Sequence, residues 1–178
     1  MNENTAVRLF PLSDYPIDRS DLFALYKLSL FKFIDQTFGW VENFQQSRFD
    51  ASYPDEAFSV ILLGAQAVGY VSQKSELDSL HLSLLLLQPA HRRRGVGRKV
   101  MQSITETASL TGKFVTLSCF LCNKPALTFY RKQGFVIVST DECFATLQGP
   151  SPYAPSPRQL VERSTATDNK DPYNRPVK

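Results

Sequence analysis

Apolar side chains recur along the chain at two spacings, which divide it into short strands and helices. "AVRLFPL", residues 6–12, alternates as expected of a first strand. The apolar residues that come next recur at helical spacing and share one face. They are Phe23, Tyr26, Leu30, Phe33 and Ile34. We expect Gly39 to end this helix, and a second, shorter helix to follow over 41–49.

The middle of the chain holds three strand candidates in succession. Residues 57–64 and 66–73 are separated by a glycine-bearing turn, which predicts a hairpin. "LDSLHLSLLLL", residues 77–87, begins by alternating and ends fully apolar, as expected of a strand buried on both faces. Pro89 cannot donate a ladder hydrogen bond, so it marks the end of that strand.

Two helices and three strands complete the predicted domain. The helices span 95–111 and 123–134, and the strands span 113–120, 135–140 and 143–148. Val100, Ile104 and Ala108 form the apolar stripe of the first helix, and Asn123 is a good N-cap for the second. The order β-α-α-β-β-β-α-β-α-β-β, without an internal repeat, predicts one mixed α/β (α+β) domain.

Composition changes after residue 149, because six of the chain's eleven prolines lie within 150–178. We therefore expect one domain over 1–149 and a proline-rich C-terminal tail over 150–178. The 178 residues are 43% hydrophobic and 21% charged, which is typical of a globular protein. A net charge of +3 is small for a strongly basic nucleic-acid binder.

No part of the sequence has the pattern of a membrane segment. There is no run of ~18 apolar residues, and the N-terminus lacks a positive region followed by an apolar one. We expect a cytoplasmic protein that does not associate with membranes.

Three cysteines, Cys119, Cys122 and Cys143, make a disulfide framework improbable. Cys119 and Cys122 form a C-x-x-C before a helix start, so a redox role stays open. Cys119 also lies near the end of an apolar strand, which favours a buried, inert thiol. Zinc would need two further ligands nearby, and we expect no metal site.

"QPAHRRRGVGRKV", residues 88–100, places the densest positive charge directly after the most apolar strand. A helix start leaves its first backbone N–H groups unpaired, and Gly95 and Gly97 remove Cβ atoms where a phosphate would approach. The pattern therefore predicts a phosphate-binding loop. It matches neither G-x-x-x-x-G-K-[ST] nor G-x-G-x-x-G, since Val100 stands where the latter needs glycine.

R-x-x-G-x-G, read from Arg92 to Gly97, resembles motif A of the GNAT superfamily of N-acetyltransferases. "LLLLQP" is similar to the strand and proline before that family's loop, and "NKPALTFYRKQGF", residues 123–135, resembles its motif B. The order of predicted elements agrees over residues 6–148. The resemblance implies a central mixed, mostly antiparallel sheet of about seven strands, flanked by four helices and splayed after the fourth strand.

The resemblance also implies acetyl-CoA as co-substrate and a set of residues that hold it. Backbone groups of Leu85 and Leu87 would pair with the pantetheine arm, Asn123 would contact that arm, and Phe129 would pack nearby. The pyrophosphate would lie on the loop, on the backbone amides of Arg93, Arg94, Gly95, Val96, Gly97 and Arg98, with Arg92 as the arginine that the motif specifies.

Tyr130 is the expected general acid for the departing sulfur. A thiolate of pKa about 8.5 leaves when an amine attacks a thioester, and a positioned phenol can donate to it. The alternative is a tyrosine that packs at the helix surface for area alone.

The amine also has to lose a proton. His81 shares strand parity with Ser83, Leu85 and Leu87, so we expect one face to carry all four. If that face receives the acceptor, His81 is a candidate base, and otherwise it is a hydrogen-bonded wall residue. Glu76 and Asp78 are weaker candidates, because they lie at the start of the strand, away from the thioester. His91 is expected to be a solvated turn residue.

The segment "FIDQTFGWVENFQQSRF" is rich in aromatic residues and corresponds to the region that shapes the acceptor site in this superfamily. It resembles a subgroup with a "GWDE"-like run, in which Val41 replaces the aspartate. Trp40, Glu42 and Gln45 are the candidate acceptor contacts. Alternatively, Trp40 and Phe44 belong to the core.

The favoured hypothesis is an N-acetyltransferase in which a primary amine attacks acetyl-CoA directly in a ternary complex. A non-catalytic acyl-CoA-binding protein on the same fold is the main alternative. A nucleic-acid-binding module is a third, disfavoured because no aromatic residue interrupts the basic run. The acceptor, a small-molecule or peptide amine, the preferred acyl length and a homodimeric state stay open.

Overall fold

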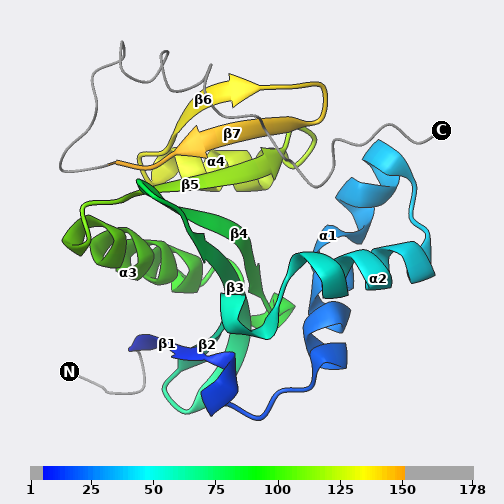
Figure 1. The fold of residues 1–178 in the computed structure, drawn as a ribbon, viewed down its shortest axis with the longest axis horizontal. Helices are drawn as coiled ribbons and strands as arrows, with labels where there is room; N and C mark the ends of the chain where they lie inside the picture. The colour runs from blue at the N-terminus through cyan, green and yellow to red at the C-terminus, as the bar shows by residue number, and fades with distance from the viewer. Residues whose placement is uncertain (1–5, 151–178) are drawn as a thin grey trace.

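The computed structural model describes residues 6–150, which form a seven-stranded sheet in the order β1-β2-β3-β4-β5-β7-β6 (Figure 1). The strands are β1 (Val7–Pro11), β2 (Phe58–Leu63), β3 (Gln66–Ser75), β4 (Ser79–Leu87), β5 (Phe114–Phe120), β6 (Val136–Thr140) and β7 (Phe144–Gln148). The helices are α1 (Arg19–Phe38), α2 (Glu42–Ser52), α3 (Val96–Leu110) and α4 (Lys124–Lys132). This confirms the predicted fold class.

Every strand pairing in the described residues is antiparallel except that of β4 with β5. That parallel ladder joins Ser79–Leu82 to Phe114–Leu117 only, although β4 continues to Leu87. The two strands therefore separate beyond Leu82, and the sheet opens there (Figure 1). The expected splay after the fourth strand is confirmed.

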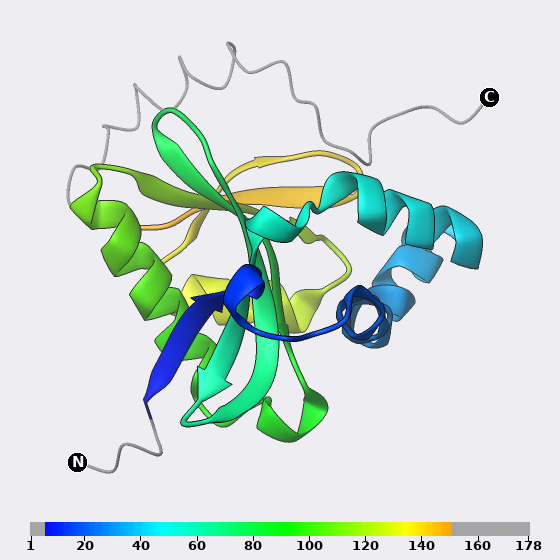
Figure 2. The ribbon, with the colours of Figure 1, turned by 60° about the horizontal axis from the view of Figure 1, so that its bottom comes forward.

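The helices cover the sheet in two layers (Figure 2). Side chains of α3 and α4 join a mostly aliphatic cluster with residues of β3, β4, β5 and β7. Side chains of α1 and α2 join a second cluster, in which eight of the twelve buried members are Phe or Tyr. We call these the aliphatic layer and the aromatic layer.

The predicted apolar stripe of α3 is confirmed, because Val100, Ile104 and Ala108 are buried in the aliphatic layer. The helix ends at Leu110, and Gly112, with a φ of 70°, turns the chain toward β5. A positive φ is strained for other residues, which explains the glycine.

A bulge in β4 overturns the expected parity of His81. Ser72 pairs with Leu84 but Gln73 pairs with Leu82, so Ser83 is an extra residue without a direct partner on β3. Such an insertion reverses the side-chain alternation along the strand. Leu80, Leu82, Leu85 and Leu87 consequently pack on the aliphatic layer, whereas His81 is on the opposite face. The prediction that His81 shares a face with Leu85 and Leu87 is wrong.

Several boundaries also differ from the expectation. β4 begins at Ser79 rather than at residue 77, because Leu77 lies in the hairpin turn and is 91% exposed. α2 extends to Ser52. Three short 3-10 helices, Leu12–Asp14, Asp55–Ala57 and Pro89–His91, were not predicted, since each is a single turn without its own apolar period. The predicted tail lies almost wholly outside the described residues.

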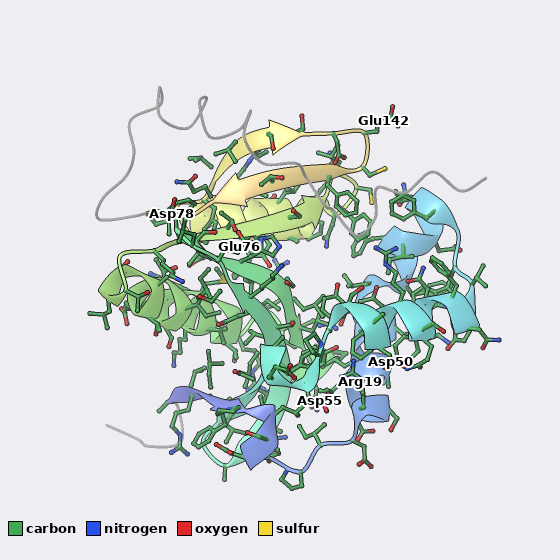
Figure 3. The ribbon with its side chains drawn as sticks, in the orientation of Figure 1. Arg19, Asp50, Asp55, Glu76, Asp78 and Glu142 are labelled. Carbon is green, nitrogen blue, oxygen red and sulfur yellow. The ribbon has the colours of Figure 1, made fainter. Side chains whose placement is uncertain are left out.

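Arg19 joins the start of α1 to the end of α2 (Figure 3). Its guanidinium forms ion pairs with Asp50 and Asp55 and also donates to the carbonyl oxygen of Tyr53. It lies over the rings of Phe49 and Phe58, with 5.2 and 5.7 Å from Cζ to the ring centroids. One arginine, Arg19, therefore connects the start of α1 to the end of α2 and to two rings of the aromatic layer.

Candidate active site

The loop between β4 and α3 presents a run of unpaired backbone amides. The N–H groups of residues 93–98 donate to no acceptor in the described part of the chain. Arg93 and Gly95 both have positive φ, 59° and 80°, and Gly95 precedes the first turn of α3. Alternating left-handed residues before a helix start form a concave nest of amides that suits phosphate oxygens.

The two glycines of the loop serve different purposes. A Cβ on Gly95 would meet no heavy atom within 4 Å, so its surroundings are open, and its φ of 80° favours glycine. A Cβ on Gly97 would lie 3.3 Å from the ring of Phe129. Gly95 thus shapes the amide nest, whereas Gly97 lets α3 approach α4 closely.

The guanidinium of Arg92 bonds to β4 and to α1. Its Nε donates to the carbonyl oxygen of Leu87 at 2.8 Å, and its Nη2 donates to Ser29 Oγ on α1 at 2.9 Å. The Ser29 contact carried no signal in the sequence, because 63 residues separate the two side chains. The arginine that the motif specifies is therefore bonded to the strand and to α1.

The other arginines, Arg93, Arg94 and Arg98, are exposed around the nest. His91 is 9% exposed, and its Nδ1 is a buried atom without a hydrogen-bond partner in the described residues. The expectation that His91 is a solvated turn residue is wrong, because the single turn Pro89–His91 folds its side chain inward.

Beyond the point where β5 departs, β4 has an open edge. Gln88 donates its backbone N–H to Val68 on β3, so alternate residues along β4 direct their backbone groups to β3. Leu85 and Leu87 direct theirs to the open side, as the resemblance implied. Within residues 6–150, the carbonyl oxygen of Leu87 accepts from Arg92, and the β4–β5 ladder, which ends at Leu82, leaves this edge of β4 without a strand partner.

α4 brings Asn123, Phe129 and Tyr130 to the same side of the open edge. The side chain of Asn123 caps the helix, accepting from the N–H of Ala126 at 3.2 Å. Phe129 and Tyr130 pack against the aliphatic layer together with Leu85 and Leu87. The structure thus brings Phe129 and Tyr130 together with Leu85 and Leu87, whereas Asn123 serves as the N-cap of α4.

The surroundings of Tyr130 favour the protonated form of its phenol. Its ring lies 5.1 Å from that of Phe129 and 5.9 Å from that of Phe135. Burial of the hydroxyl, and secondarily the nearby Cys119, raise the pKa of Tyr130 well above its usual value. A group held in this form can donate a hydrogen bond but does not act as a base.

Within residues 6–150, Cys119, Cys122 and Cys143 form no disulfide bond. Burial, and to a smaller extent Cys122, raise the pKa of Cys119 to about 12, so its thiol stays protonated. A thiolate is the reactive form of cysteine. These features support the expected inert thiol at Cys119 rather than a redox pair.

His81 is on the side of the sheet that faces the aromatic layer. Its Nδ1 lies 3.0 Å from Thr116 Oγ1, and the two residues are register partners on β4 and β5. They occupy the last part of the ladder before the strands separate. His81 and Tyr130 thus flank the opening from opposite faces of the sheet.

Trp40, Glu42 and Lys27 form a compact contact at the corner between α1 and α2. Glu42 accepts from Lys27 Nζ and from Trp40 Nε1, each at 2.7 Å, and these hydrogen bonds lower the pKa of Glu42. Phe31 packs on Trp40, with 5.1 Å between ring centroids.

Gln45 is buried on the inner face of α2, and its Oε1 has no hydrogen-bond partner in the described residues. The idea that Phe44 belongs to the core is wrong, because it is 57% exposed. The roles of Trp40, Glu42 and Gln45 toward an acceptor stay predictions.

Glu76 and Asp78 lie in the β3–β4 turn, whereas Glu142 lies in the β6–β7 turn (Figure 3). Glu76 accepts a hydrogen bond from Ser79 at 3.0 Å. Among residues 6–150 no group of His, Cys, Asp and Glu side chains could hold a metal ion. No helix in the same range combines the length and apolar character needed to cross a bilayer.

Residues 21–135 match the sequence profile of the acetyltransferase (GNAT) family, and the chain belongs to that family. The match includes most of α1, all of α2, the amide nest and α4. A comparison with curated proteins gave no match.

Among solved structures, a PaiA N-acetyltransferase from Thermoplasma acidophilum in complex with coenzyme A is 16% identical, with a TM-score of 0.60 over 82% of this chain and 99% of that one. An acetyltransferase from Thermus thermophilus is 24% identical, with a TM-score of 0.59 and coverages of 83% and 98%. The ribosomal-protein-S18-alanine N-acetyltransferase from Escherichia coli is 18% identical, with a TM-score of 0.54 and coverages of 85% and 97%. At these identities the likeness establishes the fold.

Proposed function

We propose that the protein is an N-acetyltransferase that moves the acetyl group of acetyl-CoA to a primary amine by direct attack in a ternary complex. Its membership of the GNAT family supports acetyl transfer in general. The observation that carries the proposal is the run of unpaired amides at residues 93–98, beside an open strand edge. A similar structure that contains coenzyme A supports the use of an acyl-CoA in this fold.

The chain's own groups fit such a co-substrate. The amides around Gly95 suit two adjacent phosphates, and the open space at that glycine leaves room for them. Backbone groups of Leu85 and Leu87 on the open edge of β4 can pair with the amides of an extended arm, with Phe129 packed nearby and Asn123 as a further contact of that arm. The bound thioester supplies an activated acetyl carbon at the opening of the sheet.

Tyr130 and His81 can manage the two proton transfers that the reaction needs. The amine nitrogen forms a bond to the acetyl carbon, the carbon–sulfur bond breaks, the nitrogen loses a proton and the sulfur gains one. The Tyr130 hydroxyl, protonated at working pH, donates toward the sulfur. His81, held by Thr116, accepts the proton of the amine from the opposite face, directly or through water.

The acceptor is a small-molecule or peptide amine that approaches along the aromatic layer, where Trp40, Glu42 and Gln45 are the candidate contacts. We expect the protein to work in the cytoplasm without a nucleic-acid or membrane partner.

The substitution Gly95→Glu tests the proposal at the amide nest. It adds bulk and a negative charge where the pyrophosphate would lie, so we expect coenzyme A binding by calorimetry to weaken ~100-fold or more. Gly112→Glu is the matched control: Gly112 also has a positive φ and open surroundings, but it is at the other end of α3. We expect the control to bind as the wild type does.

Activity is measured as thiol release from acetyl-CoA with a panel of amines. Turnover on at least one amine, lost in Gly95→Glu and kept in Gly112→Glu, supports the proposal. Tight acetyl-CoA binding without turnover on any amine would instead identify a non-catalytic acyl-CoA-binding protein. Equal binding by the two glutamate variants would contradict the placement of the site.

A further inference from the structure

We propose that Arg92 is a positioning residue that couples the amide nest to helix α1, so that ligand binding at the loop stabilises the helix on the acceptor side. The inference rests on the proposed function, because it takes the nest to be the coenzyme A site. It goes beyond that function by assigning Ser29, on α1, a role in cofactor affinity.

The contacts of Arg92 define the link. One guanidinium donates to the end of β4, at Leu87, and to the middle of α1, at Ser29. The loop that carries Arg92 has few other bonds. His91 and Arg92 donate their backbone N–H groups to Gln88 and Pro89, and Arg94 reaches Ala90 at 3.4 Å. All of these are local, so Arg92–Ser29 is the hydrogen bond that joins the loop to the opposite layer.

The residue after Arg92 has a strained backbone conformation, so the contacts of Arg92 are important for the shape of the loop. Arg93 has a φ of 59°, in the left-handed region that costs free energy for any residue except glycine. The amides that form the nest follow immediately. A loop held in a strained conformation needs contacts that fix it, and Arg92 fixes it on both sides.

The other end of the link is the helix of the aromatic layer. Ser29 lies in α1 between Tyr26, which is buried in that layer, and the apolar residues Phe33 and Ile34. The helix continues to Gly39 and then to the corner formed by Trp40, Glu42 and Lys27. A ligand that orders Ser29 therefore also orders helix α1, which leads to the corner with the candidate acceptor contacts.

Coupling between two sites is reciprocal: a change on α1 must alter affinity at the nest as much as the ligand alters α1. A direct phosphate contact by Arg92 predicts something different. In that case the Ser29 hydroxyl would be irrelevant to coenzyme A affinity, and Arg92→Lys would keep part of the charge contribution.

The test uses the full chain and coenzyme A as the probe, in calorimetry. We expect Ser29→Ala to weaken binding ~3- to 10-fold, as loss of a charge-assisted hydrogen bond does. Ser29→Thr keeps the hydroxyl and should bind within about twofold of the wild type. Ser20→Ala makes the same change at an exposed position of the same helix and should have no effect.

A double-mutant cycle separates coupling from direct contact. We expect Arg92→Gln to weaken binding to a similar extent, and Ser29→Ala/Arg92→Gln to bind no worse than Arg92→Gln alone. Hydrogen exchange adds a readout on the helix. Coenzyme A should slow exchange within residues 22–34 in the wild type and in Ser29→Thr, but much less in Ser29→Ala.

Binding by Ser29→Ala equal to that by Ser20→Ala, with unchanged protection of α1, would overturn the inference and leave the proposed function intact. A wild-type chain that binds no coenzyme A would overturn both.

Discussion

The two layers that cover the sheet differ in how they are built. The aliphatic layer is formed by branched side chains on α3 and on the strands, and the motif residues of the loop and α4 adjoin it. The aromatic layer consists largely of rings on α1, α2 and the strands, with Phe49 touching Phe23, Tyr26, Tyr53 and Phe58 at centroid distances of 5.4, 5.1, 5.5 and 5.8 Å.

The two layers would also have different roles in the proposed reaction. Under the proposed function, backbone amides and a strand edge would hold the acyl-CoA, and these groups need a fixed loop geometry. The acceptor would meet side chains of the aromatic layer, which can vary without disturbing the loop.

The largest expected effect tests whether the aromatic layer is packed as a core. Phe49 is 1% exposed, so Phe49→Ala should lower the free energy of unfolding by ~3–5 kcal/mol, through lost burial and the cavity left behind. Urea denaturation followed by circular dichroism measures this. Phe44→Ala, on the same helix at 57% exposure, should change it by less than about 1 kcal/mol. A small effect at Phe49 would mean that the layer is loosely packed.

The next effect concerns the acid on the cofactor side. Tyr130→Phe should reduce kcat ~100-fold while coenzyme A affinity stays within about twofold. Burial raises the pKa of Tyr130, so its hydroxyl stays protonated below pH ~10, and the fold-loss should be the same from about pH 6 to about pH 9. Steady-state kinetics at several pH values measure it. An unchanged kcat would assign the proton donor to another group or to water.

The smallest effect concerns the base on the opposite face. His81→Asn should reduce kcat/KM ~10-fold, because an imidazole acts as a base only in its neutral form. Steady-state kinetics at one fixed pH, with an amine that the wild type acetylates, measure this loss. Thr116→Val, which removes the hydrogen bond to Nδ1 but keeps the imidazole, should cost less, about threefold. An unchanged kcat/KM in His81→Asn would show that His81 only lines the wall.

Much of the fold could be predicted because it depends on local patterns. The stripe of Val100, Ile104 and Ala108 requires helix α3, and the apolar run that ends before Pro89 requires a buried strand. The bulge at Ser83 could not be predicted, since it depends on how β4 registers against β3. That one residue reversed the face of His81 relative to Leu85.

Part of the candidate site could likewise be predicted from the sequence, and part could not. The loop around Gly95 could be predicted because glycine spacing, a preceding strand and a following helix are all local features. The contact of Arg92 with Ser29 was not, because it joins residues far apart in the chain, and the pairing of Glu42 with Lys27 and Trp40 depends on the angle between α1 and α2.

The sequence by itself determined where the amide nest lies, since a helix start after glycine leaves its N–H groups unpaired in any fold. It also determined the family, through motifs that are continuous in the chain. Only the tertiary structure decided what surrounds the nest. It turned Arg92 toward α1, buried His91, and placed His81 and Tyr130 on opposite faces of one opening. Register and packing bring distant residues together, and no local pattern encodes them.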